Sequence, residues 1–309
     1  MVCNCRLGVS QRRFGLSLYL RLFKLSNPTS IVQFAHRLNL LCTVAFCALL
    51  VSPAQSQDKP SNTEKARIYL LGEIHDNPNG HSLRLDFINQ LISDRQNVMI
   101  AMEQFDRENQ PALELALKSC KDAACVRAGV GTPGWEWGFY EPLVQLALDK
   151  KVTLIAANVS NADVRKVITN GFSAIYSPDI ISAYKLNQIP GSIFNAQSQS
   201  IQEGHCNMLP PQAIGPMVKG QIARDIWMAS IINSLQNQTI ILIAGNGHVR
   251  KDAGVYQWLS SVNQKQTQVH GYVEQPESSY PNWFDQVHVV PTTQREDQCL
   301  IFKKQINKQ

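Results

Sequence analysis

Short hydrophobic runs alternate with amphipathic segments along most of the chain after residue 66. We predict strands at these runs: Ile68–Leu71, Val98–Met102, Val152–Ala156, Thr239–Ala244, Val269–Glu274, Val287–Val290 and Leu300–Phe302. Apolar residues recur at helical spacing over 80–93 and 109–120, and another helix opens at Pro142. Strands that alternate with helices are typical of βαβ units. The pattern therefore predicts an α/β fold with a mostly parallel sheet flanked by helices.

The middle of the chain has a different pattern. Helical spacing over 161–237 is interrupted at Pro190 and again at Pro210, and a long amphipathic segment then runs from about 216 to 235. No run in this stretch has the character of a strand. We therefore predict an α/β domain built from 67–160 and 238–305, with a smaller helical domain inserted at 161–237. A further helix is predicted near 255–259.

The first 54 residues have the composition of an export signal. They contain six of the 29 basic residues and no acidic residue, and the apolar stretch Leu38–Val51 is followed by Ser52-Pro53-Ala54. This arrangement predicts a secretory signal, because an apolar segment precedes small residues at the usual cleavage positions. The stretch is shorter than the roughly 20 residues of a membrane-spanning helix. An uncleaved anchor stays an alternative, and residues 55–66 are predicted to form a linker.

Two cysteines in this region bear on membrane attachment. Neither Cys42 nor Cys47 directly follows a small residue, so the sequence does not favour a lipid anchor. We expect an exported protein that is periplasmic or membrane-associated.

The formal charge of +5 does not indicate a nucleic-acid-binding protein. Beyond residue 54 the chain has 23 basic and 24 acidic residues, so the excess of positive charge lies in the N-terminal segment. A DNA-binding domain requires a basic surface, and this composition excludes that class.

Four cysteines lie beyond the signal segment. Cys120 and Cys125 are five residues apart and could pair in an oxidising compartment, while Cys206 and Cys299 either pair or stay buried as thiols. No two cysteines have the spacing of a zinc site.

Polar side chains directly follow four of the predicted strands. Because ligands of open parallel sheets bind beyond the carboxyl ends of the strands, we predict that these residues line one pocket. They are Glu73 and His75 after the first strand, Glu103 after the second, Asn158 after the third, and Asn246 and His248 after the strand at Thr239–Ala244.

These residues have the chemistry of a metal site. Two carboxylates, Glu73 and Glu103, and two imidazoles, His75 and His248, form a set suited to Mn, Fe, Co or Zn. In a hydrolase such a set would activate a metal-bound water, with a carboxylate as base. Two alternatives stay open: a merely hydrogen-bonded Glu-x-His pair, and an anion-binding turn at Gly245–His248.

A dense aromatic run at Trp135–Tyr140 precedes the helix that opens at Pro142. These aromatics either cap the core or present a phenol to ferric haem, since tyrosinate is an established axial ligand. Tyr176 and Tyr184 are weaker candidates for that role. Lys219, Arg224 and Asp225 lie on the long predicted helix, where we expect charges to be solvated.

Several local motifs together resemble the ChaN family of iron-regulated, haem-binding exported proteins, within the erythromycin-esterase and Tiki superfamily. The resemblance runs in order from about residue 68 to about residue 275. Its motifs are Leu71-Gly72-Glu73-Ile74-His75-Asp76, Ala101-Met102-Glu103-Gln104-Phe105, Trp137 with Tyr140-Glu141-Pro142-Leu143, Ala156-Ala157-Asn158, His205-Cys206 with Met208-Leu209-Pro210, and Gly245-Asn246-Gly247-His248-Val249.

The resemblance implies a haem-binding protein of iron acquisition. It further implies a haem-dependent homodimer around two stacked haems, with an outer-membrane haem receptor as a partner. A tyrosine would hold each iron, and a histidine and a lysine would lie near the propionates. Carried over by motif, these are Tyr140, His205 and Lys219. The alternative function is a divalent-metal-dependent hydrolase of the Tiki or erythromycin-esterase type, with Glu73, His75, Glu103 and His248 as its catalytic residues.

Overall fold

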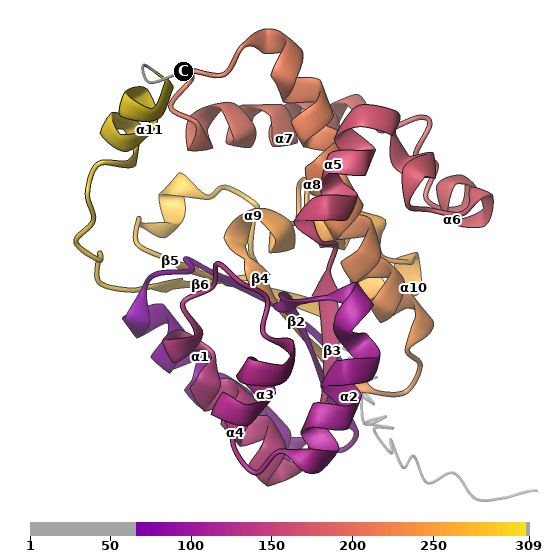
Figure 1. The fold of residues 1–309 in the computed structure, drawn as a ribbon, viewed down its shortest axis with the longest axis vertical. Helices are drawn as coiled ribbons and strands as arrows, with labels where there is room; N and C mark the ends of the chain where they lie inside the picture. Colours follow the sequence, from indigo (N-terminus) through magenta and orange to yellow (C-terminus); the bar gives the residue numbers. More distant parts are fainter. Residues whose placement is uncertain (1–65, 307–309) are drawn as a thin grey trace, which may run out of the picture. The chain divides into compact units, whose positions relative to one another are not determined.

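The computed structural model describes residues 66–306, and a six-stranded sheet forms their centre (Figure 1). The strands are β1 (Ile68–Glu73), β2 (Val98–Asp106), β3 (Thr153–Asn158), β4 (Thr239–Gly245), β5 (Thr267–Val273) and β6 (Gln286–Val289). Their order is β3-β2-β4-β1-β5-β6, and every neighbouring pair is parallel. The predicted α/β fold with a parallel sheet is confirmed.

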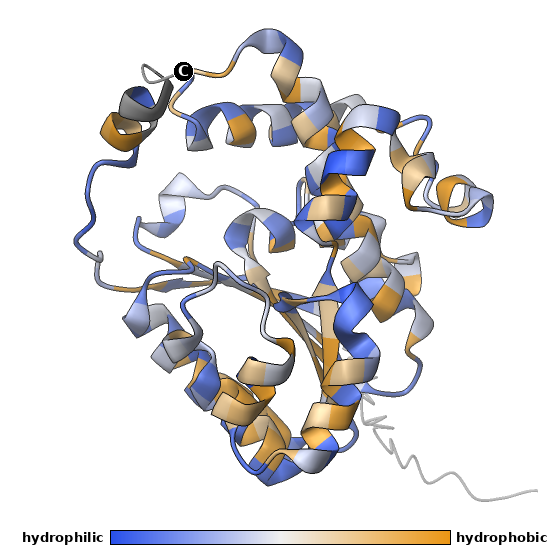
Figure 2. Cartoon of the chain, viewed as in Figure 1, coloured by the Kyte–Doolittle hydropathy of each residue, from blue (hydrophilic) through white to orange (hydrophobic). Residues whose placement is uncertain are grey.

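Side chains of the central strands are buried on both faces of the sheet. In β1, Ile68 and Leu70 belong to one hydrophobic core, whereas Tyr69 and Leu71 belong to a second core on the opposite face. Successive residues of a strand point to opposite faces, so a strand covered on both sides has no polar alternation. The central strands are accordingly coloured mainly as hydrophobic in Figure 2.

Four helices from the first half of the chain cover the face of Tyr69 and Leu71. They are α1 (Pro78–Asp94), α2 (Gln110–Ser119), α3 (Ala123–Val130) and α4 (Glu141–Lys150). Short 3₁₀ turns also occur at Arg107–Asn109, Trp137–Phe139, Phe172–Ala174, Val255–Trp258 and Glu277–Ser279.

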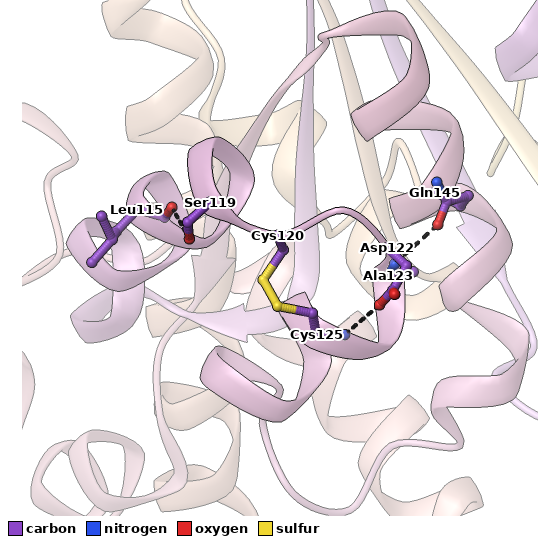
Figure 3. Close-up of a disulfide and its surroundings, with 7 residues drawn as sticks. All are labelled: Leu115, Ser119, Cys120, Asp122, Ala123, Cys125 and Gln145. Carbon is purple, nitrogen blue, oxygen red and sulfur yellow. Dashed lines mark hydrogen bonds between the residues drawn. A yellow bond between two sulfur atoms is a disulfide. The ribbon is translucent and has the colours of Figure 1, made fainter.

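A disulfide joins α2 to α3 (Figure 3). Cys120 and Cys125, which the sequence analysis named as a possible pair, form a disulfide with 5.6 Å between their Cα atoms. Helix α3 was not predicted, although Asp122 caps it by accepting a 2.8 Å hydrogen bond from the backbone N–H of Cys125. The backbone N–H of Ala123 donates to the Gln145 side chain on α4, 3.0 Å away, so this turn is tied to the neighbouring helix.

The opposite face of the sheet carries the remaining core helices. They are α5 (Asn161–Asn170), α6 (Pro178–Ala183), α7 (Gly191–Gly204), α8 (Pro211–Ser234), α9 (Asn246–Val249) and α10 (Ser261–Lys265). Helix α8 contributes Val218, Ile222 and Ile226 to the core. Within the described part of the chain, 161–234 contains helices and no strand.

The seventh predicted strand, Leu300–Phe302, is wrong. These residues lie in helix α11 (Gln298–Ile306), which begins where Asp297 accepts hydrogen bonds from the backbone N–H groups of Cys299 (2.8 Å) and Leu300 (3.2 Å). Three apolar residues cannot by themselves distinguish a strand from a helix. Cys299 also forms a disulfide with Cys206, which joins α11 to the loop after α7.

The predicted export signal at Leu38–Val51 lies outside the described residues, as does nearly all of the predicted linker. Within 66–306, no helix is both long enough and apolar enough to cross a bilayer.

Strand order decides where the polar strand ends meet. Strand β4 lies between β2 and β1, so the carboxyl ends of these three strands are adjacent. The register places Glu73, the last residue of β1, beside Gly245, the last residue of β4. Such a point, where strand order departs from sequence order, is where open α/β sheets form a crevice.

Candidate functional site

A pocket of about 430 Å³ lies at the carboxyl ends of the strands. Its walls include His75, Glu103, Trp135, Asn158, Asn161 and Arg224. Three of the residues predicted to share a pocket, His75, Glu103 and Asn158, therefore do so. The volume is that of a site for a small molecule.

Glu73 lies beneath this pocket, buried among donors. Its Oε1 accepts hydrogen bonds from His75 Nδ1 (2.7 Å), the Tyr140 hydroxyl (2.6 Å) and Gln104 Nε2 (3.1 Å). Its other oxygen forms an ion pair with Arg84. Burial opposes the charged carboxylate, but the attraction of Arg84 and the hydrogen bond from His75 outweigh it and lower the pKa of Glu73 to about 2. Glu73 is thus a fixed anion that orients its neighbours.

His75 is oriented by this anion. Because Nδ1 is bound to Glu73, Nε2 is the ring nitrogen left for other contacts, and a Cβ atom at Gly245 would lie only 3.0 Å from it. The side chain is 47% exposed and packs edge-on against Trp135, with ring centroids 4.9 Å apart. Burial opposes the charged ring, but Glu73 and Glu103 raise the pKa of His75. The arrangement suits proton exchange with a molecule in the pocket.

A second cluster of buried charged side chains consists of Glu103 on β2, Asp225 on α8 and His248 on α9. His248 Nδ1 donates to Asp225 Oδ1 at 2.6 Å, and His248 Nε2 lies 3.3 Å from Glu103 Oε1. Glu103 also accepts a 2.8 Å hydrogen bond from the backbone N–H of Gly245. Burial alone would lower the pKa of His248, but the two carboxylates raise it to about 10. His248 is therefore an imidazolium between two acids.

The predicted metal set does not fit this arrangement. Within the described residues, no three His, Cys, Asp or Glu side chains are placed to hold one ion. The Glu73 carboxylate is ion-paired with Arg84, and both nitrogens of His248 face carboxylates. The four residues gather as predicted, but as two ion-paired groups.

Asn246, which was predicted to line the pocket, is not among the residues of its walls. Its side-chain nitrogen donates to the backbone carbonyl of Tyr272 at 2.8 Å. Its side-chain oxygen lies against Gly72, where an added Cβ would come within 2.2 Å of it. Asn246 therefore packs α9 against β1, and only glycine fits at position 72.

Three residues of this site were missed in the sequence. Arg84 and His81 lie on α1, where Arg84 Nη2 donates to His81 Nδ1 (2.8 Å) and His81 Nε2 donates to the carbonyl of His75 (2.9 Å). Asp225 was expected to be solvated on its helix, but it is fully buried. A charged residue on a predicted helix has no local signal that reveals which side chain it meets across the fold.

A known protein family matches most of the described chain. The model of the family described as haem-binding uptake, Tiki superfamily, ChaN, matches residues 61–259. The chain belongs to this family. The predicted resemblance to ChaN proteins is thereby confirmed, and no curated protein matched the chain.

Two solved structures illustrate what the chain is similar to. The structure described as cofacial haem binding to ChaN of Campylobacter jejuni is 20% identical, covers 67% of this chain and 82% of that chain, and has a TM-score of 0.55. A mutant of the erythromycin esterase EreC in its open conformation is 13% identical, covers 78% and 80%, and has a TM-score of 0.39. The first of these similarities shows the shared fold.

The haem contacts predicted from the ChaN resemblance lie in two regions. Tyr140 is at the start of α4 with no exposed surface, and it donates to Glu73. Burial and the Glu73 charge both raise the pKa of Tyr140 above its usual range. A phenol in this setting is neither accessible to an external haem iron nor able to ionise readily, so the structure does not favour Tyr140 as the axial ligand.

The other two predicted contacts lie in the helical segment. His205 follows α7, half-buried, with Nδ1 donating to the carbonyl of Ile201 at 2.7 Å. Lys219 is exposed on α8 and borders a pocket of about 480 Å³, whose other walls include Phe172, Ile181, Leu186 and Phe194.

Proposed function

We propose that this protein binds haem as an exported component of iron acquisition. The observation that carries the proposal is the match of residues 61–259 to a haem-binding uptake family. A haem-dependent homodimer and an outer-membrane haem receptor belong to the same proposal.

The pocket beside Lys219 is our candidate for the haem contact. Phe172, Ile181, Leu186 and Phe194 give it apolar walls suited to a porphyrin face. The ammonium of Lys219 is exposed at its border and suits a propionate. His205, on the loop after α7, is proposed as a further propionate contact. These residues therefore fit the polarity of haem.

Tyr184 is the phenol that we propose for the iron. It lies in the same helical segment but lines a different pocket from Lys219, is half-buried, and accepts a 3.1 Å hydrogen bond from Asn233. Unlike Tyr140, it has no carboxylate as a hydrogen-bond partner among the described residues. Ferric haem would gain a tyrosinate ligand there.

A hemin titration tests both parts of the proposal. Wild-type protein should bind hemin saturably with a tyrosinate-type spectrum. Tyr184→Phe should lose that spectrum and Tyr140→Phe should keep it. The reverse result would identify Tyr140 as the iron ligand. Sedimentation should detect a dimer only with hemin. Absence of saturable binding by the wild type would refute the haem proposal itself.

Hydrolysis at the strand ends is a second candidate. It is favoured by one observation: Glu73 holds His75 so that Nε2 is the nitrogen left for the pocket, next to Glu103. In this geometry His75 would act as a general base toward a water, without a metal. His75→Ala should abolish turnover of a p-nitrophenyl ester, and treatment with a chelator should not. Loss of turnover on chelation, restored by Zn²⁺ or Mn²⁺, would instead support the metal-dependent alternative.

A further inference from the structure

The wall of the strand-end pocket includes an arginine, Arg224, that forms no ion pair with any described carboxylate. Arg224 Nε donates to Asn158 Oδ1 at 3.1 Å, and Nη2 donates to Asn161 Oδ1 at 2.8 Å. Both acceptors are neutral amides, which orient a guanidinium without neutralising it. No carboxylate of the described residues forms an ion pair with Arg224, and its Nη1 has no hydrogen-bond partner among them.

Two of the three acids that line this pocket form ion pairs with other residues. Asp76 is held by Arg295 through contacts of 2.6 and 2.7 Å, and Glu103 faces the His248 imidazolium. Glu136 is exposed. Among the described charged residues that line this pocket, Arg224 and the exposed Glu136 are the two without an ion pair.

The surroundings of Arg224 add positive potential and an apolar wall to the same pocket. Asn161 is the first residue of α5, so the positive end of that ten-residue helix lies at the wall that holds Arg224. Asp106 is linked to Arg224 through the Asn158 side chain, which accepts from Arg224 and donates to Asp106 at 2.8 Å. Trp135 supplies an aromatic wall.

We propose that this pocket binds a small organic carboxylate, with the carboxylate on Arg224 and the apolar part of the molecule against Trp135. A planar guanidinium matches a carboxylate through two parallel hydrogen bonds. A single guanidinium supplies one positive charge, so a monoanion fits this pocket better than a dianion such as phosphate. The inference concerns this pocket alone and depends neither on haem binding nor on hydrolysis.

The test compares phenylacetate with its neutral amide, phenylacetamide. Calorimetry or saturation-transfer NMR on the wild-type chain should show phenylacetate binding about tenfold or more tightly than the amide, since a hydrogen bond to a charged group contributes that much. Inorganic phosphate should bind more weakly than phenylacetate. In Arg224→Gln the preference for the acid should disappear, whereas Arg224→Lys should keep part of it.

Arg165→Gln is the matched control. Arg165 lies exposed on α5, outside the walls of the pocket, so its removal should leave the preference intact. Circular dichroism of each variant verifies folding. Equal affinity for the acid and the amide, no saturable binding of phenylacetate, or an unchanged preference in Arg224→Gln would overturn the proposal. Tighter binding of phosphate would overturn the assignment to carboxylates. Hemin binding by the wild type is measured separately, so either proposal can fail alone.

Discussion

The buried contact between Asp225 and His248 offers the sharpest test of the site's electrostatics. Asp225 has no exposed surface, and its Oδ1 accepts a 2.6 Å hydrogen bond from His248 Nδ1. Asp225→Ala removes this acceptor and leaves the imidazolium with Glu103, 3.3 Å away, as its remaining counter-ion. We expect the variant to fold with a lower free energy of unfolding.

The expected loss is about 3 kcal/mol. Removing one partner of a buried ion pair typically costs about 3–5 kcal/mol, because the other charge stays buried without compensation. Two features place this pair at the lower end of the range. Glu103 still faces His248, and burial raises the pKa of Asp225 to about 6 despite the attraction of His248, so the carboxylate itself is costly to bury.

The loss should depend on pH in a defined direction. His248 has a folded pKa of about 10, raised above its ordinary value of 6.5 by Glu103 and Asp225 against the effect of burial. A group with a raised pKa stabilises the native state fully below its unfolded pKa and loses that contribution as pH rises through the folded value. The difference between wild type and Asp225→Ala should therefore shrink between pH 7 and pH 10.

Urea unfolding at pH 7 and at about pH 9.5 measures both effects, and an NMR titration follows the His248 imidazole. The pKa of His248 should fall in the variant. Asp86→Ala, which removes an exposed acid from α1, is the control and should change stability by less than about 0.5 kcal/mol. A loss below about 1 kcal/mol, an unchanged His248 pKa, or a difference that grows with pH would refute the reasoning.

Three other variants test the packing around the site. Gly72→Ala should cost at least about 1–3 kcal/mol in urea unfolding, because its Cβ would lie 2.2 Å from a side-chain oxygen; a neutral effect would contradict the close approach. Arg84→Ala, which leaves the Glu73 carboxylate buried without its cation, should cost about 3–5 kcal/mol at pH 7, and less under acid conditions that protonate Glu73. Cys299→Ser opens the loop closed with Cys206 and should cost about 4 kcal/mol under oxidising conditions, with no difference from wild type once dithiothreitol reduces both proteins.

Most of the sheet was predictable because its signal is local. The central strands β1, β2 and β4 are short, mainly hydrophobic runs, since strands covered on both faces need apolar side chains on both, whereas the edge strand β6 is partly exposed. The errors occurred where local signals conflict. Leu300–Phe302 has the composition of a strand, but the Asp297 cap starts a helix there. Helix α3 was missed because it is short and follows a polar turn.

The location of the site could be predicted from the sequence, but the hydrogen bonds and ion pairs of its residues could not. Glu73 and Glu103 lie in the carboxyl-terminal parts of β1 and β2, His248 follows β4, and parallel strands bring their carboxyl ends to one edge. Arg84 and Asp225 lie on the helices α1 and α8, and nothing in their surroundings along the sequence indicates burial. They nevertheless decide the charge state of the site, because each forms an ion pair with a strand-end residue.

By itself, the sequence determined the α/β class, the strand-end gathering of polar residues and the ChaN-family membership, since all three depend on patterns and motifs along the chain. Only the tertiary structure decided that the buried Tyr140 donates to Glu73, that His248 lies between two acids, and that Arg224 lines the pocket without an ion pair to any described carboxylate. The physical reason is that charge pairing and burial depend on distances between side chains that are remote in the sequence, and those distances arise only when the layers of the fold pack together.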